Sequence, residues 1–132
     1  MDVHVFGTDR EIDKSLIDAE AAVIHEQVRE YEAGERQRFD LEIVYPEGFT
    51  GEVMQAMNEI PFGETRTYGE LAADLDTAPI AIGGACGRNP LPVIVPCHRV
   101  VGVDSLVGYM GGLDLKRTLL EHEGATIPGE DR

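Results

Sequence analysis

Residues 77–103 contain no aspartate or glutamate, in a chain that is acidic in most other places. Acidic residues make up 25 of the 132, so about five would be expected in a stretch of this length. A segment that excludes negative charge is either packed in a core or faces a polyanion. Because Gly87, Arg88 and Asn89 are not typical core residues, we favour a polyanion-facing surface and keep a buried core as the alternative.

The overall charge argues in the opposite direction. The formal net charge is −14, and lysine occurs only at positions 14 and 116. At low salt such a chain repels the phosphates of nucleic acid. The acidity could be an ordinary solvated face, or an adaptation to molar salt, where the screening length falls to about 3 Å. The scarcity of lysine favours the salt-adapted interpretation.

Length and cysteine usage restrict the class of protein. A chain of 132 residues predicts one domain with at most a small appendage, large enough to fold without disulfides. Cys86 and Cys97 form no C-x-x-C pattern, and the four histidines are scattered, which argues against a disulfide framework or a metal site. Since no leader pattern or long apolar run is present, we expect a cytoplasmic protein without membrane association.

The apolar pattern upstream predicts two helices and a strand. A helix is expected over 13–33, ending before Gly34. Residues 38–46 alternate between apolar and polar side chains, which predicts a strand. A second helix is expected after Thr50. With the elements that follow, the pattern predicts an α/β fold that is mostly α.

A pair of short helices follows. Thr67 and Glu70 have the spacing of a capping box, which predicts a helix start, and Pro79 is suited to the first turn of the next helix. Two short helices joined by a tight link are typical of a helix-turn-helix. The second helix consists of small and apolar residues with one arginine, so its backbone could approach a partner closely.

Next comes an apolar run at 92–96 that is strand-like, followed directly by Cys97, His98 and Arg99. A buried cysteine is usually an inert core residue. Cationic neighbours, however, lower the pKa of a thiol and raise its reactivity. Cys97 is therefore our candidate nucleophile, whereas Cys86 lacks such neighbours and is interpreted as structural.

The last predicted helix ends at Gly124 and places Lys116, Leu120 and Glu123 on one stripe. A carboxylate on a leucine face requires a partner, because burying an unpaired charge is unfavourable. His98 in turn requires an orienting acid. We therefore predict a relay from Cys97 through water and His98 to Glu123.

Three stretches carry a resemblance to a known family: IPFGETRTYGELA, GGACGRNPLPVIVPCHRVVG and GYMGGLDLKRTLLEHEGA. Together they resemble the O6-alkylguanine-DNA alkyltransferases, also called methylated-DNA–protein-cysteine methyltransferases. The resemblance implies a winged-helix-like domain over 49–126, after a shortened N-terminal cap over 1–48 and before a tail over 127–132. It also implies a monomer that binds DNA from the minor groove, flips an alkylated guanine and transfers the alkyl group irreversibly to cysteine without a cofactor.

The resemblance assigns roles by position. It makes Cys97 the alkyl acceptor, His98 its water-linked base, Glu123 the residue that orients the histidine, and Asn89 a brace between recognition helix and active-site turn. The implied substrate-binding residues are Tyr68, Val95, Tyr109, Met110 and Lys116. The implied DNA-binding residues are Ile80, Ala81, Gly84, Ala85, Arg88 and Arg99.

Some of these positions have simpler interpretations or depart from the family pattern. Tyr68 could be a partly buried aromatic, and Lys116 a surface cation. The family usually has an arginine where this chain has Ile80, and a polar residue where it has Met110, which leaves only a backbone N–H as donor. An apolar side chain can still wedge between bases.

Three other functions remain open at this point. An alkyltransferase-like protein that binds lesions without repairing them would fit Ile80. A plain winged-helix regulator would require neither Cys97 nor Glu123. A small cysteine hydrolase would require an oxyanion hole, which the sequence does not specify.

Overall fold

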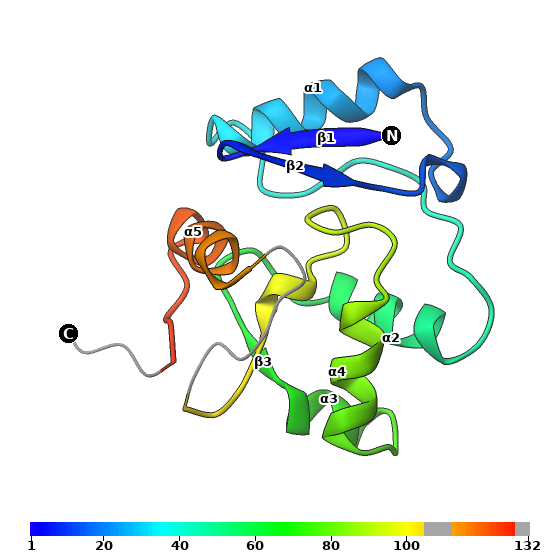
Figure 1. Ribbon diagram of the computed structural model, residues 1–132, viewed down its shortest axis with the longest axis vertical. Helices are drawn as coiled ribbons and strands as arrows, with labels where there is room; N and C mark the ends of the chain where they lie inside the picture. Colours follow the sequence, from blue (N-terminus) through cyan, green and yellow to red (C-terminus); the bar gives the residue numbers. More distant parts are fainter. Residues whose placement is uncertain (105–111, 129–132) are drawn as a thin grey trace.

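The computed structural model describes residues 1–104 and 112–128 of the chain. Figure 1 shows a hairpin and helix α1 at one end, helices α2, α3 and α4 grouped at the other, and α5 beside them. This arrangement confirms the predicted α/β, mostly α class. The elements in chain order are β1 (Asp2–Val5), β2 (Thr8–Glu11), the 3-10 turn η1 (Lys14–Leu16), α1 (Ala21–Glu32), α2 (Phe49–Asn58), β3 (Arg66–Thr67), α3 (Tyr68–Asp74), α4 (Pro79–Gly87), the 3-10 turn η2 (Cys97–Arg99), β4 (Val100–Val101) and α5 (Leu113–Glu123).

The N-terminal hairpin was not predicted. Strands β1 and β2 pair antiparallel around Phe6 and Gly7, both of which have positive φ. Val3 and Val5 point inward and are fully buried, and α1 packs along β1 (Figure 1). The hairpin therefore buries one face against the helix, as an antiparallel pair with one apolar face requires.

The helix predicted over 13–33 is wrong in its first third. Asp13 caps a single 3-10 turn by accepting a hydrogen bond from the Ser15 N–H, and α1 begins only at Ala21. Ile17 between them is extended and forms an isolated antiparallel bridge with Ile43.

The strand predicted over 38–46 is reduced to that one bridge. Its alternation is real, since Phe39, Leu41, Ile43 and Tyr45 are partly buried against the core. The backbone of Asp40, however, is satisfied by a side chain. The Gln27 amide accepts from the Asp40 N–H at 2.8 Å and donates to its carbonyl at 3.0 Å, where a neighbouring strand would otherwise bind.

Helices α2, α3 and α4 follow the sequence closely. Helix α2 turns Val53, Met54 and Met57 into the core. The capping box at α3 is confirmed, with both reciprocal hydrogen bonds present, and Pro79 lies in the first turn of α4 as predicted. Helices α3 and α4 pack on each other, and α4 also packs on α2.

The acid-free stretch divides into two parts. Residues 91–101 are all buried, so for them the core alternative is correct. The outward side of α4 and its flanks is exposed, including Ile80, Gly84 and Arg88. The outward side of α4 therefore remains available as a polyanion-facing surface, and 91–101 do not.

One hydrophobic cluster joins the N-terminal segment to the rest of the chain. It contains Val5, Ile24 and Tyr31 together with Val53 and Leu91. The domain boundary at 48/49 stays a prediction. Within residues 1–104 and 112–128, no helix combines the length and apolar character of a membrane span.

Candidate active site

The turn before Cys97 is held by Asn89. Its side-chain amide donates to the Val95 carbonyl at 3.0 Å, and its amide oxygen accepts from the Leu91 N–H at 3.0 Å. Asn89 is 2% exposed, so these bonds are protected from water. Asn89 therefore ties the segment after α4 to the turn before Cys97, and its role in the reaction stays a prediction.

Residues 92–96 form a turn, so the strand predicted there is wrong. Pro92 and Pro96 have no N–H to offer a sheet ladder, and Val93 adopts a φ of 73°, which reverses the chain. The Val95 N–H instead donates back to the Leu91 carbonyl at 2.8 Å. Val95 itself is fully buried. The result is a rigid turn that delivers Cys97 into a buried 3-10 helix.

Glu123 is the centre of the buried charges. Its carboxylate accepts from His98 Nε2 at 2.8 Å, from Arg99 Nε at 2.8 Å and from the Tyr31 hydroxyl at 2.6 Å. This confirms the prediction that a carboxylate on the leucine face has partners. Burial alone would raise the pKa of Glu123, but the hydrogen bonds from His98 and Arg99 outweigh it and lower the pKa to about 2.

His98 is held as a neutral imidazole. Burial lowers its pKa, against the opposing effect of the Glu123 carboxylate. Because an ionised carboxylate can only accept, Nε2 carries the proton and Nδ1 is left as an acceptor. Nδ1 is buried and has no hydrogen-bond partner within the described residues. A buried acceptor of this kind requires a water or a donor group.

Arg99 is not placed to bind DNA. It is 7% exposed, and its guanidinium donates to both oxygens of Glu123 and to the Ile60 carbonyl at 2.7 Å. The prediction of a DNA contact is therefore corrected, since a donor set already bound inside the protein cannot reach a phosphate. Arg99 instead neutralises the buried carboxylate.

Lys116 and Tyr68 lie together. Lys116 is fully buried, which excludes the surface-cation alternative; its ammonium donates to the Val100 carbonyl at 2.7 Å and to the Tyr68 hydroxyl at 3.4 Å. Burial lowers the pKa of Lys116 to about 8. Burial also raises the pKa of Tyr68, so its hydroxyl keeps its proton near neutral pH.

One side of helix α4 is exposed to solvent. Ile80 is 86% exposed, Gly84 and Arg88 are exposed, and Ala81 is partly exposed. Ala85 is 1% exposed and faces the core, so its predicted DNA contact is corrected.

Two predicted site residues, Tyr109 and Met110, lie outside the described residues. The interpretation of Cys86 as a structural thiol stays a prediction, since both cysteines are buried. Cys86 lies 3.6 Å from the sulfur of Met57, and burial raises its pKa to about 12.

Residues 48–125 match the family model for the DNA binding domain of 6-O-methylguanine DNA methyltransferase. The chain belongs to this family. It is 49% identical over 104 residues to a methylated-DNA–protein-cysteine methyltransferase of Methanosarcina acetivorans, covering 75% of this chain and 66% of that protein. The resemblance stated from the motifs is thereby confirmed.

Solved structures of the family superpose on the chain. Mycobacterium tuberculosis OGT in complex with DNA matches with a TM-score of 0.74 and 43% identity, over 81% of this chain and 69% of that chain. Schizosaccharomyces pombe Atl1, in complex with damaged DNA containing O6-carboxymethylguanine, matches with a TM-score of 0.51 and 29% identity, over 57% of this chain and 74% of Atl1.

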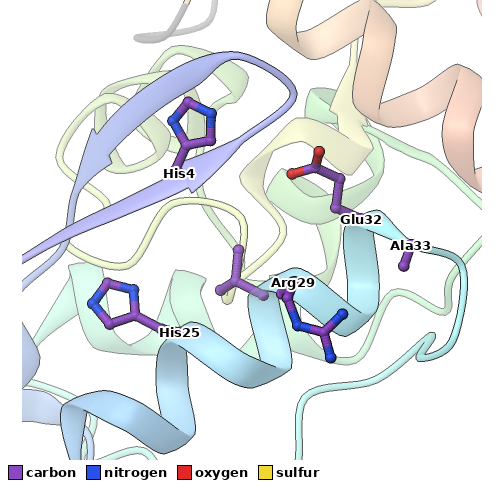
Figure 2. Close-up of a pocket in the computed structure, with 6 residues that line it drawn as sticks. His4, His25, Arg29, Glu32 and Ala33 are labelled. Carbon is purple, nitrogen blue, oxygen red and sulfur yellow. The ribbon is translucent and has the colours of Figure 1, made fainter.

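A separate cavity of about 430 Å³ lies between the hairpin and α1. Figure 2 shows His4 on the hairpin across from His25 on the helix. Three of the polar side chains that line it have partners: His4 bonds to Asp9, Arg29 donates to Glu26, and Glu32 accepts from the Phe6 N–H. Within the described residues, no group of three His, Cys, Asp or Glu side chains is arranged to hold a metal ion.

Proposed function

We propose that this alkyltransferase-family chain repairs DNA by moving the alkyl group of O6-alkylguanine onto Cys97, once per molecule and without a cofactor. The observation that carries the proposal is the buried arrangement of Cys97, His98 and Glu123, in which the Nδ1 of a neutral histidine has no hydrogen-bond partner among the described residues. A water at that acceptor would link the histidine to the thiol. Membership of the family supports the same chemistry.

The step balances as a single displacement. The Cys97 proton passes through the water to His98 Nδ1, and the thiolate attacks the alkyl carbon. A carbon–sulfur bond forms while the bond from that carbon to guanine O6 breaks, with its electron pair leaving on the base. The guanine anion takes up one proton, equal to the one that Cys97 released, and His98 returns to its neutral form, so the step consumes no net proton. Glu123 stabilises the transient imidazolium through its 2.8 Å hydrogen bond.

Other residues are proposed to hold the flipped base. Tyr68 retains its hydroxyl proton and accepts a hydrogen bond from the buried Lys116 ammonium. It can therefore donate a hydrogen bond to the leaving purine. Asn89 keeps the turn rigid, and Val95, Tyr109 and Met110 are proposed to wall the pocket. We place the DNA on the exposed side of α4, where small residues permit close approach and Ile80 can wedge between bases.

We further propose a monomer that acts in the cytoplasm. Reducing conditions there keep thiols from oxidising, and neither Cys86 nor Cys97 is part of a disulfide in the structure.

The test is the fate of the DNA. An oligonucleotide with one O6-methylguanine is incubated with increasing protein, digested and analysed for guanine and O6-methylguanine. We expect conversion to stop at one lesion per protein molecule, and Cys97→Ser to convert none. Conversion of many lesions per molecule, or full conversion by Cys97→Ser, would exclude the proposal.

Lesion sensing without repair is the second candidate. Ile80 favours it, because the charge and hydrogen bond of the usual arginine are missing. Tight binding of the methylated oligonucleotide with no guanine formed at low or molar salt would select this function.

A further inference from the structure

Tyr31 connects the N-terminal segment to the relay at two points. Its hydroxyl donates to Glu123 Oε2 at 2.6 Å, and its backbone carbonyl accepts from His122 Nε2 at 2.7 Å. One residue of α1 therefore binds two successive residues of α5. In Figure 1 the C-terminal end of α1 and helix α5 both lie on the left of the view.

The ring of Tyr31 is fixed as well. It is 1% exposed and packs against the rings of His122, Phe39 and Phe62 at centroid distances of 5.0, 5.5 and 6.2 Å. Aromatic contacts on several sides leave the ring little room to rotate. The hydroxyl is consequently aimed at the carboxylate by packing.

The position of the hydroxyl bears on His98. Glu123 Oε2 accepts from Tyr31, from His98 and from Arg99, so three donors share one oxygen. The charged groups that face His98 are Glu123 and Lys116 on α5 and Arg99 beside it, and only the carboxylate favours the imidazolium. Each additional donor to Oε2 reduces the negative charge that Glu123 presents to the imidazole.

We propose that Tyr31 is a positioning residue for alkyl transfer, which fixes the Glu123 carboxylate and moderates its pull on His98 so that Nδ1 stays an acceptor. This inference rests on the proposed function. It makes the N-terminal segment a part of the active site, whereas the sequence suggested only a cap.

The test compares Tyr31→Phe with Tyr45→Phe. Tyr45 belongs to the same segment, and its hydroxyl accepts from Asn58 with no link to Glu123. In Tyr31→Phe we expect the pKa of His98, followed by imidazole NMR, to rise by roughly one pH unit, and transfer on the acid limb of the rate–pH profile to fall about tenfold. Tyr45→Phe should match the wild type in both.

An unchanged His98 titration and rate profile in folded Tyr31→Phe would overturn the proposal, as would equal shifts in Tyr45→Phe. The His98 titration requires no alkyl transfer, so it decides the role of Tyr31 even if the proposed function fails. Should Tyr31→Phe not fold, the contact between Tyr31 and Glu123 is tested instead by tyrosine ring NMR of Glu123→Gln. The Tyr31 signal must move while that of Tyr45 stays, and a stationary Tyr31 signal would contradict the contact.

Discussion

Glu123 and His98 lie 25 positions apart in the chain and are joined by a 2.8 Å hydrogen bond between fully buried side chains. Such a bond fixes the imidazole tautomer, because the carboxylate can only accept. It requires α5 and the turn after Val95 to be placed accurately relative to each other. The turn held by Asn89 positions His98, and the buried leucines of α5 position Glu123.

Glu123→Gln should destabilise the fold by about 3 kcal/mol at pH 7, because it breaks a buried pair. The pKa of Glu123 is about 2 in the folded chain against an unperturbed 4.5. A lowered pKa means that the stabilisation is complete above pH 4.5 and is lost as the pH falls towards 2. Urea unfolding should therefore show a difference from the wild type that shrinks below pH 4.5. The exposed Glu121→Gln on the same helix is the control, and a pH-independent difference would contradict the assignment.

Ile80→Arg should raise transfer from lesions in duplex DNA several-fold and leave single-stranded substrates nearly unaffected. Ile80 is 86% exposed, so the change should alter the free energy of unfolding by less than about 0.5 kcal/mol. Val23→Arg, on the exposed side of α1, adds the same charge elsewhere. Equal gains in both variants would show that charge alone, and not insertion at position 80, limits the reaction.

Arg88→Ala should weaken DNA binding uniformly across sequences. Arg88 is exposed at the end of α4, and a phosphate contact from it would release one counterion. The slope of log K against log salt should therefore become shallower by about 1. Arg29→Ala on α1 is the matched control. The same slope in wild type and Arg88→Ala would place the DNA elsewhere.

Potassium chloride at molar concentration should stabilise the fold and preserve transfer. The net charge of −14 makes the surface repel itself at low salt, and screening removes that repulsion. Thermal unfolding and transfer measured from 0.1 to about 3 M salt test this. A melting temperature and transfer rate that both fall steadily with salt would favour an ordinary acidic face.

Part of the site could be predicted because it depends on local pattern. Helical spacing alone places Glu123 on a leucine face, and the Thr67 capping box is a contiguous signal. The hairpin could also have been found, since Val3 and Val5 alternate before the Phe6–Gly7 turn.

The rest depends on tertiary contacts. Arg99 follows His98 directly, but adjacency does not show which way a side chain points in a 3-10 turn, and its guanidinium turned inward to Glu123. Tyr31 meets Glu123 across 92 positions, where the C-terminal end of α1 comes close to the C-terminal end of α5. A periodic pattern shows that Tyr31 is buried and gives no information about its partner.

The most direct test of the central claim is the intact mass of the protein after incubation with O6-methylguanine DNA. We predict a gain of one methylene in the wild type and in Cys86→Ser, located by peptide mapping on Cys97, and no gain in Cys97→Ser. A wild type that binds this DNA with unchanged mass at both low and molar salt, or a methyl group mapped to Cys86, would contradict the account.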